Sequence, residues 1–299
     1  MQYSPAIYVA GTEYDAQGRA YPIVWKDGTA YRLTAGGNDD ASAESIFVSG
    51  NTQYVAGSVN DSARLWTNSA SQTLNSAVSY ARSVTVANSN VYVAGERNFG
   101  AALWTNGTPQ SLGGREANSV YVSGSDVYVG GTNNQDGAVI WKNGTVLHTL
   151  PGGYTVLSLY VSGNDVWACG FDGDWEWGGS ARLWKNGVRQ SLNNIGNAES
   201  QACSIAVLGN DVYVAGYNEN PQGKYVAKLW KNGTAQNLSD GIYNAAALSV
   251  FVFRNDVYVT GYENDAQGKA QATIWKNSSV FKRLTNGNSE TFSRSIFVK

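Results

Sequence analysis

Two tryptophans and three carboxylates alternate in one short stretch, residues 171–179, which reads Phe-Asp-Gly-Asp-Trp-Glu-Trp-Gly-Gly. An indole has a large apolar face and one polar N–H, and carboxylates accept hydrogen bonds from hydroxyl groups. This composition predicts a platform for a sugar ring, built from Asp172, Asp174, Trp175 and Trp177. The alternative is structural, with one tryptophan folded back as a lid over the neighbouring chain.

Further acidic and aromatic residues recur in similar short segments. The candidate ligand-binding residues among them are Glu13, Tyr14, Asp15, Glu219 and Glu263. A carboxylate pair assembled from Glu13, Asp61 or Glu263 would suit hydrolysis of a glycosidic bond, which needs an acid and a second carboxylate. Oxygen ligands from Asp172 and Asp174 would suit Ca²⁺, although no segment has the twelve-residue calcium-loop pattern. Apart from that Ca²⁺ alternative, the sequence predicts no cofactor and no metal.

Composition argues against several reaction and partner classes. The chain has a single histidine, His148, so it offers no multi-histidine metal site and no evident Ser–His pair. The formal net charge of −2 gives no basic surface for nucleic acid. No apolar run approaches the roughly 18 residues that span a bilayer. We therefore expect a protein that is not an enzyme, has no nucleic-acid partner and does not span a membrane.

Four landmarks recur seven times in the same order, and they predict the architecture that positions these residues. The first is a serine opening an apolar strand, at Ser45, Ser83, Ser119, Ser158, Ser204, Ser249 and Ser295. The second is a Tyr-Val-Ala-Gly type strand, ending at Gly11, Gly57, Gly95, Gly131, Gly170, Gly216 and Gly261. The third is a tryptophan before a tight turn, at Trp25, Trp66, Trp104, Trp141, Trp184, Trp230 and Trp275. The fourth is a leucine after that turn, at Leu33, Leu74, Leu112, Leu150, Leu192, Leu238 and Leu284.

Each repeat is read as four short antiparallel strands, one for each landmark. Successive serines are 36 to 46 residues apart, which is the length of a four-stranded propeller blade. Asn-Gly pairs such as Asn143-Gly144 separate the third and fourth strands, and they tolerate the positive φ angles of a type I′ hairpin turn. The sequence therefore predicts an all-β fold, a seven-bladed β-propeller with four antiparallel strands per blade.

The two ends of the chain belong to the same predicted blade. The sequence begins inside a second strand, at residues 7–11, and its last serine landmark opens a first strand at Ser295. We expect pairing of the two ends to close the ring, because closure removes two open sheet edges. The closing blade is expected from residues 1–44 plus 294–299, and the others at 45–82, 83–118, 119–157, 158–203, 204–248 and 249–293, all within one domain, 1–299.

Strand alternation puts the connections on two faces. The turns between the first and second strands, and between the third and fourth, are short and alike, so turn geometry alone explains them; we call their side the turn face. The remaining connections differ from blade to blade, and loops on a rigid scaffold commonly carry binding residues. We call their side the variable face, and we look for function there.

Residues just before each first strand are expected to ring the mouth of the central channel. They are Glu44, Arg82, Asn118, Leu157, Cys203, Leu248 and Arg294. Half of this ring is polar and half apolar, which would suit a small amphipathic ligand such as a sugar. The alternative is a water-filled channel with no ligand.

The repeated tryptophans and the two cysteines have structural explanations as well as functional ones. We expect the tryptophans to pack between blades; seven equivalent ligand sites, as in multivalent lectins, are the alternative. Cys169 and Cys203 are expected near the variable face as buried thiols. A disulfide between them would require their Cα atoms to lie within about 7 Å.

Residues 102–114, Ala-Leu-Trp-Thr-Asn-Gly-Thr-Pro-Gln-Ser-Leu-Gly-Gly, are followed by Ala-Asn-Ser-Val at 117–120 and a Val-Tyr-Val-Gly-Gly strand. This unit resembles the HAF-type repeats of bacterial extracellular propellers, and the resemblance extends over all seven units. It implies secretion or display at the cell surface and a binding role, and it carries over no catalytic residue. The Gly-His and Trp-Asp pairs of WD40 repeats and the Asp boxes of sialidases are missing.

The leading hypothesis is a monomeric, extracellular or cell-surface module that binds a glycan through its variable face. A protein–protein interaction scaffold using the same face is the main alternative. A designed or reconstructed repeat propeller with no natural ligand is another, favoured by the start in mid-blade after Met1. A polysaccharide-acting enzyme comes last.

Overall fold

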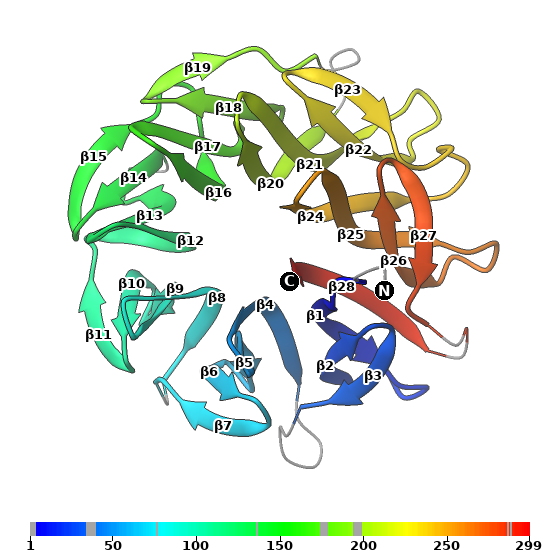
Figure 1. Ribbon diagram of the computed structural model, residues 1–299, viewed down its shortest axis with the longest axis horizontal. Helices are drawn as coiled ribbons and strands as arrows, with labels where there is room; N and C mark the ends of the chain where they lie inside the picture. The colour runs from blue at the N-terminus through cyan, green and yellow to red at the C-terminus, as the bar shows by residue number, and fades with distance from the viewer. Residues whose placement is uncertain are drawn as a thin grey trace.

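Seven small sheets form a ring around a central axis (Figure 1). The computed structural model describes residues 4–33, 40–75, 77–135, 137–173, 179–193, 199–285, 287 and 289–299. Each sheet has four antiparallel strands, and these residues contain no helix, so none that could cross a membrane. The predicted seven-bladed β-propeller is confirmed.

Blades are numbered by their order around the ring, and strands are given from the inside outward. Blade 1 consists of β28 (Glu290–Val298), β1 (Ile7–Tyr14), β2 (Ala20–Lys26) and β3 (Thr29–Arg32); blade 2 consists of β4 (Ala41–Ser49), β5 (Thr52–Val59), β6 (Ser62–Thr67) and β7 (Ala70–Thr73). Blade 3 consists of β8 (Ser79–Ala87), β9 (Asn90–Arg97), β10 (Gly100–Thr105) and β11 (Thr108–Ser111); blade 4 consists of β12 (Gly114–Ser123), β13 (Asp126–Asn133), β14 (Ala138–Lys142) and β15 (Thr145–Thr149). Blade 5 consists of β16 (Thr155–Ser162), β17 (Asp165–Phe171), β18 (Ala181–Lys185) and β19 (Val188–Gln190); blade 6 consists of β20 (Ser200–Leu208), β21 (Asp211–Glu219), β22 (Tyr225–Lys231) and β23 (Thr234–Asn237). Blade 7 is β24 (Ala245–Phe253), β25 (Asp256–Asn264), β26 (Ala270–Lys276), β27 (Ser279–Arg283).

The ring closes through blade 1, as the sequence predicts. β28 pairs with β1 along its whole length, from Ile7 opposite Val298 to Tyr14 opposite Glu290. Next to this pairing, the peptide groups of Ala6 and Lys299 exchange two hydrogen bonds of 2.8 and 3.1 Å. The last strand of the chain therefore completes the sheet begun by the first.

The seven repeated tryptophans hold neighbouring blades together. All of them are at most 1% exposed. Trp66 of blade 2 lies in one cluster with Tyr8 and Val24 of blade 1, and Trp275 of blade 7 lies in another with Leu229 of blade 6. Inter-blade packing is thus confirmed. The alternative, seven equivalent ligand sites on these tryptophans, is wrong because the faces of their indole rings are buried.

Each innermost strand contains a β-bulge at the same place. The pairing register shifts by one residue just before the landmark serine, for example between Ala43 and Ser45 in β4. The residues left in the bulges are Glu44, Arg82, Asn118, Leu157, Cys203, Leu248 and Arg294. Our expectation that they precede the strands is wrong, because β4 already begins at Ala41 and β12 at Gly114. The bulge is the physical reason, since it lets the strand continue through the extra residue.

The repeated glycine at the end of each second strand is required by this bulge. A Cβ added to Gly57 would lie 2.0 Å from the carbonyl oxygen of Ser42, and one added to Gly131 would lie 1.9 Å from that of Glu116. The other five landmark glycines meet the corresponding carbonyl at the same distance. No side chain fits there, so backbone contact explains the second landmark.

The repeated serine joins each innermost strand to the next one. The Ser45 hydroxyl accepts a hydrogen bond from the backbone N–H of Val84 in blade 3, at 3.1 Å. Equivalent bonds of 3.1–3.3 Å link every successive pair of blades, ending with Ile46 donating to Ser295 across the closure. Seven side-chain to backbone bonds thus run around the inside of the ring, and we call them the serine belt.

The turn face repeats one polar arrangement. Asn106 and Gly107 have φ angles of 50° and 84°, as a type I′ turn requires. In blade 4, the Asn143 side chain accepts from the N–H of Val127 at 2.9 Å and donates to Asp126, which is also paired with Lys142. Blades 5, 6 and 7 repeat the lysine–aspartate pair. These residues stabilise hairpins, which accounts for the uniformity of this face.

Candidate functional site at the variable face

Several acidic residues of the variable face are used by their own loops. The Asp15 carboxylate accepts from the N–H groups of Gln17 and Arg19 at 2.9 and 3.0 Å and pairs with the Arg19 guanidinium at 2.6 Å. Partial desolvation acts to raise the pKa of Asp15, but the hydrogen bonds from Arg19 and Gln17 outweigh it and lower the pKa to about 2. Asp15 therefore closes the loop between β1 and β2 as a stable carboxylate.

The same loop closure recurs around the face. The side chains of Asn133, Asn220 and Asp265 each accept from two backbone N–H groups of their own loops. Asp172 accepts from the N–H of Ser180 at 2.7 Å and pairs with Arg182. Sequence alone cannot separate such a turn-forming side chain from a ligand-binding one, because both need an Asx residue in a polar loop.

The two glutamates considered for hydrolysis are each paired with an arginine of their own blade. Glu13 lies 2.8 Å from Arg32, and Glu263 lies 2.9 Å from Arg283. Tyr14 is half-buried with its ring 5.9 Å from that of Phe292, and burial raises the pKa of the phenol. Glu219 ends β21, where its N–H donates to the carbonyl of Glu199 at 2.7 Å.

The bulge residues form a ring with two distinct arcs. Going from blade 1 to blade 4, the ring presents Arg294, Glu44, Arg82 and Asn118; from blade 5 to blade 7, it presents Leu157, Cys203 and Leu248. All seven are at least partly exposed. The polar and apolar halves expected from sequence are therefore two contiguous arcs facing each other across the ring centre.

Ion pairs and hydrogen bonds order the polar arc. Arg294 lies 3.9 Å from Glu44, and the Arg82 guanidinium pairs with Glu96 on β9. The Asn118 amide donates to the hydroxyl of Thr155 and to the carbonyl of Val156 in blade 5, at 2.9 and 3.0 Å. These contacts position charged groups next to the variable face while leaving both arginines more than 40% exposed.

The apolar arc contains one of the two cysteines. Cys169 and Cys203 are both free, the first buried and the second half-buried. Burial raises the pKa of Cys203 to about 12, and it also raises that of Cys169. Both thiols are therefore protonated at neutral pH and contribute apolar contacts.

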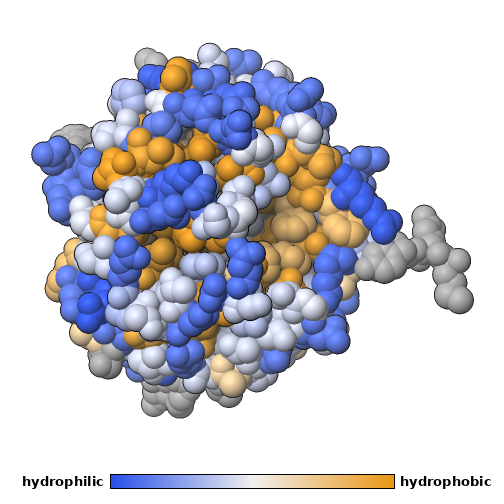
Figure 2. Space-filling view, turned by 60° about the vertical axis from the view of Figure 1, so that its left-hand side comes forward, coloured by the Kyte–Doolittle hydropathy of each residue, from blue (hydrophilic) through white to orange (hydrophobic). Residues whose placement is uncertain are grey.

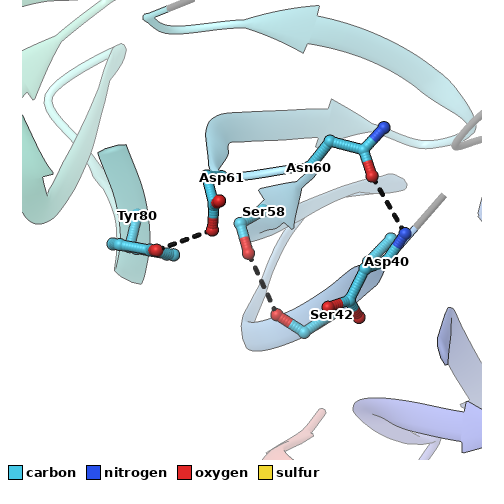
Figure 3. A pocket seen from close by; sticks show the side chains of 7 residues that line it. Asp40, Ser42, Ser58, Asn60, Asp61 and Tyr80 are labelled. Atoms are coloured by element: carbon cyan, nitrogen blue, oxygen red, sulfur yellow. Dashed lines mark hydrogen bonds between the residues drawn. The ribbon is translucent and has the colours of Figure 1, made fainter. Parts of the chain in front are cut away.

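A polar cavity of about 350 Å³ is lined by residues of blade 2 and by one residue of blade 3 (Figure 3). We call it the blade 2 pocket; its lining residues are Asp40, Ala41, Ser42, Ser58, Asn60, Asp61 and Tyr80. The Tyr80 hydroxyl donates to Asp61 at 2.6 Å, and the Asn60 side chain accepts from the N–H of Asp40 at 3.0 Å. Ser42 and Ser58 share a hydrogen bond of 3.3 Å. Carboxylate, amide and hydroxyl groups thus converge on one space.

Turn geometry explains the placement of Asp61. Asn60 and Asp61 are the only two residues between β5 and β6, and their φ angles are 47° and 55°. This tight turn brings the carboxylate of Asp61 against Tyr80 of blade 3 (Figure 3). The hydrogen bond to Asp61 raises the pKa of Tyr80, so the phenol remains a protonated donor. Asp61 was considered from sequence as one of several acids. Tyr80 was missed because its strand, β8, lies in the next blade, and Asp40, Ser42 and Ser58 were missed because nothing in the repeat pattern marks them.

Phe99 is a further residue of the variable face that was not among the predicted site residues. It occupies the corresponding turn of blade 3 with φ of 63°, and its side chain is 80% exposed. A bulky residue in this left-handed region costs roughly 1–2 kcal/mol. Strained backbone conformations of this kind cluster at functional sites.

Replacing Phe99 with glycine is expected to stabilise the fold. The change relieves the left-handed strain and creates the favoured Asn-Gly turn with Asn98, at little cost in buried surface. We expect a gain of about 0.5–1 kcal/mol in the free energy of unfolding, measured by chemical denaturation. Phe99→Ala, which keeps the strain, serves as the control; equal stability of the two variants would contradict this interpretation.

Three of the sequence-predicted residues, Asp174, Trp175 and Trp177, lie outside the described residues. Of the two acids proposed as Ca²⁺ ligands, only Asp172 is among the described residues. Its carboxylate accepts a hydrogen bond from the N–H of Ser180 and pairs with Arg182. In the part of the chain that the structure describes, no three His, Cys, Asp or Glu side chains come together as a metal site would require.

Comparison with known proteins identifies the fold and no family. No protein-family model matches the sequence, and no curated protein matches it. Among solved structures, the chain is similar to the β-propeller domain of the Trilobed protease from Pyrococcus furiosus, at 11% identity over 96% of this chain and 95% of that one, with a TM-score of 0.57. It is also similar to the extracellular domains 1-2 of Drosophila Semaphorin 1a, at 9% identity over 87% and 80% of the two chains, with a TM-score of 0.53.

A third similar structure is a puromycin-hydrolyzing peptidase of Mycobacterium tuberculosis, at 13% identity and a TM-score of 0.60. The match covers 93% of this chain but only 53% of the peptidase, so the chain spans about half the length of that protein. At these identities the likeness concerns the β-propeller alone, and function must be argued from the site.

Proposed function

We propose that this protein is a non-enzymatic binding module that holds a carbohydrate in the blade 2 pocket of the variable face. The observation that supports this most directly is the convergence of carboxylate, amide and hydroxyl groups on one cavity beside an aromatic ring. Sugars present many hydroxyl groups, each able to donate and accept. A site of this kind satisfies them with fixed oxygens and stacks one apolar ring face on an aromatic side chain.

Specific groups have specific roles under this proposal. Asp61 and Asp40 accept hydrogen bonds from ligand hydroxyls, and Asn60, Ser42 and Ser58 complete the polar wall. Tyr80 orients Asp61 and offers its ring. The exposed Phe99 lies on the same face, in the matching turn of the next blade. The protein would act outside the cell or at its surface.

A binding role is preferred to hydrolysis because of how the glutamates are held. Glu13 and Glu263 each engage an arginine of their own blade. Glycoside hydrolysis needs one carboxyl group that delivers a proton to the leaving oxygen, opposite a second carboxylate. Each of these two carboxylates is already engaged by a side chain of its own blade, at 2.8 and 2.9 Å.

Substitution of Asp61 or Tyr80 is the direct test. In a glycan array followed by calorimetry on the strongest hit, we expect Asp61→Asn and Tyr80→Phe to weaken binding at least tenfold, a loss of about 1.4 kcal/mol or more. Asparagine tolerates the left-handed turn, so Asp61→Asn preserves the fold. Asp211→Asn on the turn face is the matched control and should bind normally. An array without any hit, or full binding by Asp61→Asn, would overturn the carbohydrate proposal.

A protein ligand on the same face is the second candidate. Exposed apolar side chains on the connections of this face favour it, namely Phe99, Ile242 and Tyr243. Figure 2 shows hydrophilic and hydrophobic residues interspersed on the side of the molecule that it presents. The polar lining of the blade 2 pocket favours a small polar ligand there, and a protein partner would be indicated if Phe99→Ala abolished binding while Asp61→Asn did not.

A further inference from the structure

A second cavity, of about 260 Å³, lies where blade 7 meets blade 1, away from the blade 2 pocket. We call it the junction cavity; its lining residues are Glu13, Ile23, Trp25, Gly28, Ala30, Arg283, Leu284, Thr285 and Thr291. Lys282 crosses the junction beside it and donates to the carbonyl of Asp27 at 2.7 Å. The cavity is therefore bounded by side chains from both blades.

A buried donor without a partner lies in its wall. Trp25 is 1% exposed, and its indole N–H has no hydrogen-bond acceptor among the described residues. Four other landmark tryptophans share this lack, so Trp25 is singled out by the cavity that it lines. The equivalent Trp230 of blade 6 donates to the carbonyl of Asn193, at 3.1 Å. Leaving such a group unsatisfied is costly, and an oxygen of a molecule that enters the cavity would satisfy it.

The junction of blades 5 and 6 and the junction of blades 7 and 1 differ at the residue that follows the landmark leucine. Asn193 directly follows the landmark Leu192 of blade 5, and the matching residue of blade 7 is Thr285, after Leu284. Thr285 lines the junction cavity instead of bonding the indole. The junction of blades 7 and 1 therefore has a cavity at the position where, between blades 5 and 6, the carbonyl of Asn193 bonds the indole.

The strand next to the tryptophan also differs between these two junctions. Ala30 pairs with Trp25 in the sheet, and Ala235 pairs with Trp230 at the equivalent position. Ala235 is half-buried against the hydrophobic cluster of its junction, whereas Ala30 is exposed. The groove between the outer strands of neighbouring blades is therefore filled beside Ala235, at the junction of blades 5 and 6. It is open beside Ala30, at the junction of blades 7 and 1.

The lining charges indicate a neutral ligand. Glu13 and Arg283 are the only charged residues among those lining the cavity, and each is compensated by an ion pair in its own blade, with Arg32 and Glu263 respectively. Glu13 offers acceptors, Arg283 and Trp25 offer donors, and the threonine hydroxyls can serve as either. Ile23, Leu284 and the indole supply an apolar wall. The volume is below the roughly 300–1,000 Å³ of pockets for drug-sized molecules, so a single ring fits.

We infer that the junction cavity is a second binding site, specific for one neutral polyhydroxylated ring such as a pyranose, one of whose oxygens accepts a hydrogen bond from Trp25. Its polar groups match the mixed donors and acceptors of a sugar, and its apolar wall matches a ring face. This site is independent of the blade 2 pocket, since no residue lines both.

The test follows the indole N–H resonances of protein labelled with ¹⁵N at tryptophan. The probes are the methyl glycosides of glucose, galactose, mannose and N-acetylglucosamine, titrated to millimolar concentrations. Trp25→Phe identifies the Trp25 resonance. We expect at least one probe to shift that resonance saturably, and Ala30→Phe, which fills the open groove, to abolish the shift.

Two further variants distinguish binding in the junction cavity from binding elsewhere on the ring. Ala235→Phe, the matched substitution at the closed junction, should leave the Trp25 shift unchanged, and so should Asp61→Asn in the blade 2 pocket. If Ala30→Phe fails to fold, Arg283→Gln takes its place with an expected tenfold weaker affinity. Absence of a shift with all four probes overturns the inference, as does a shift that persists in Ala30→Phe or an affinity that Arg283→Gln leaves unchanged. Loss of the shift in Asp61→Asn would also overturn it, because the signal would then come from the blade 2 pocket.

Discussion

Deletion of residues 294–299 is expected to leave the ring open and to remove most of its stability. The deletion takes away the half of β28 that pairs with residues 7–10 of β1. It also removes Ile296 and Val298, which are 3% and 2% exposed, and each such side chain contributes roughly 1.5–3 kcal/mol. Two links of the serine belt are lost with Ser295 and Ile296.

Because domains are stable by only about 5–15 kcal/mol, we expect the truncated chain to melt far below the full chain or not to fold at all. Circular dichroism during heating measures this, with size-exclusion chromatography to detect association through the freed edge of β1. A synthetic peptide of residues 290–299, added in excess, should restore part of the lost stability. Equal melting temperatures for the truncated and full chains would contradict closure by β28.

Gly131→Ala is expected to be among the most damaging single substitutions. Its Cβ would lie 1.9 Å from the carbonyl oxygen of Glu116, so the bulge in β12 would have to move. Overpacking of this kind costs about 3 kcal/mol, which corresponds to a fall of roughly 6–12 °C in melting temperature. Differential scanning calorimetry gives both quantities.

Gly124→Ala is the matched control for this substitution. Gly124 has φ of 60° and no atom within 4 Å of an added Cβ, so only the left-handed backbone is strained. We expect a loss of about 1 kcal/mol there. If both alanine variants lose the same stability, backbone contact at the bulge is not the reason for the glycine.

Sequence periodicity was sufficient for the architecture because every blade repeats the same four landmarks. The count of seven blades, the strand order, the closure by the two ends and the burial of Trp25 and its six equivalents are all confirmed. The bulges were missed, since a residue such as Glu44 changes the pairing register without leaving any mark in the hydrophobic pattern. The close contact that explains Gly57 was hidden for the same reason.

The candidate sites were predictable only as a face of the molecule. Acidic loops suggested ligand-binding residues, yet Asp15 is occupied in closing its own loop. The blade 2 pocket joins Asp61 to Tyr80, which belongs to the next repeat, and the junction cavity joins Glu13 to Arg283 from opposite ends of the chain. Such contacts depend on how neighbouring blades pack against each other. The residue pattern within one repeat carries no information about that packing.

The way blade 1 is assembled has a consequence for the newly made chain. Blades 2 to 7 are each formed by four consecutive strands, so each has all of its strands as soon as its own stretch of chain has been made. β1 is made before blades 2 to 7, but its inner partner β28 is made after them. While blades 2 to 7 are being made, β1 therefore presents an unpaired strand edge, which is a template for aggregation. That edge stays open until β28 has been made and has paired with β1.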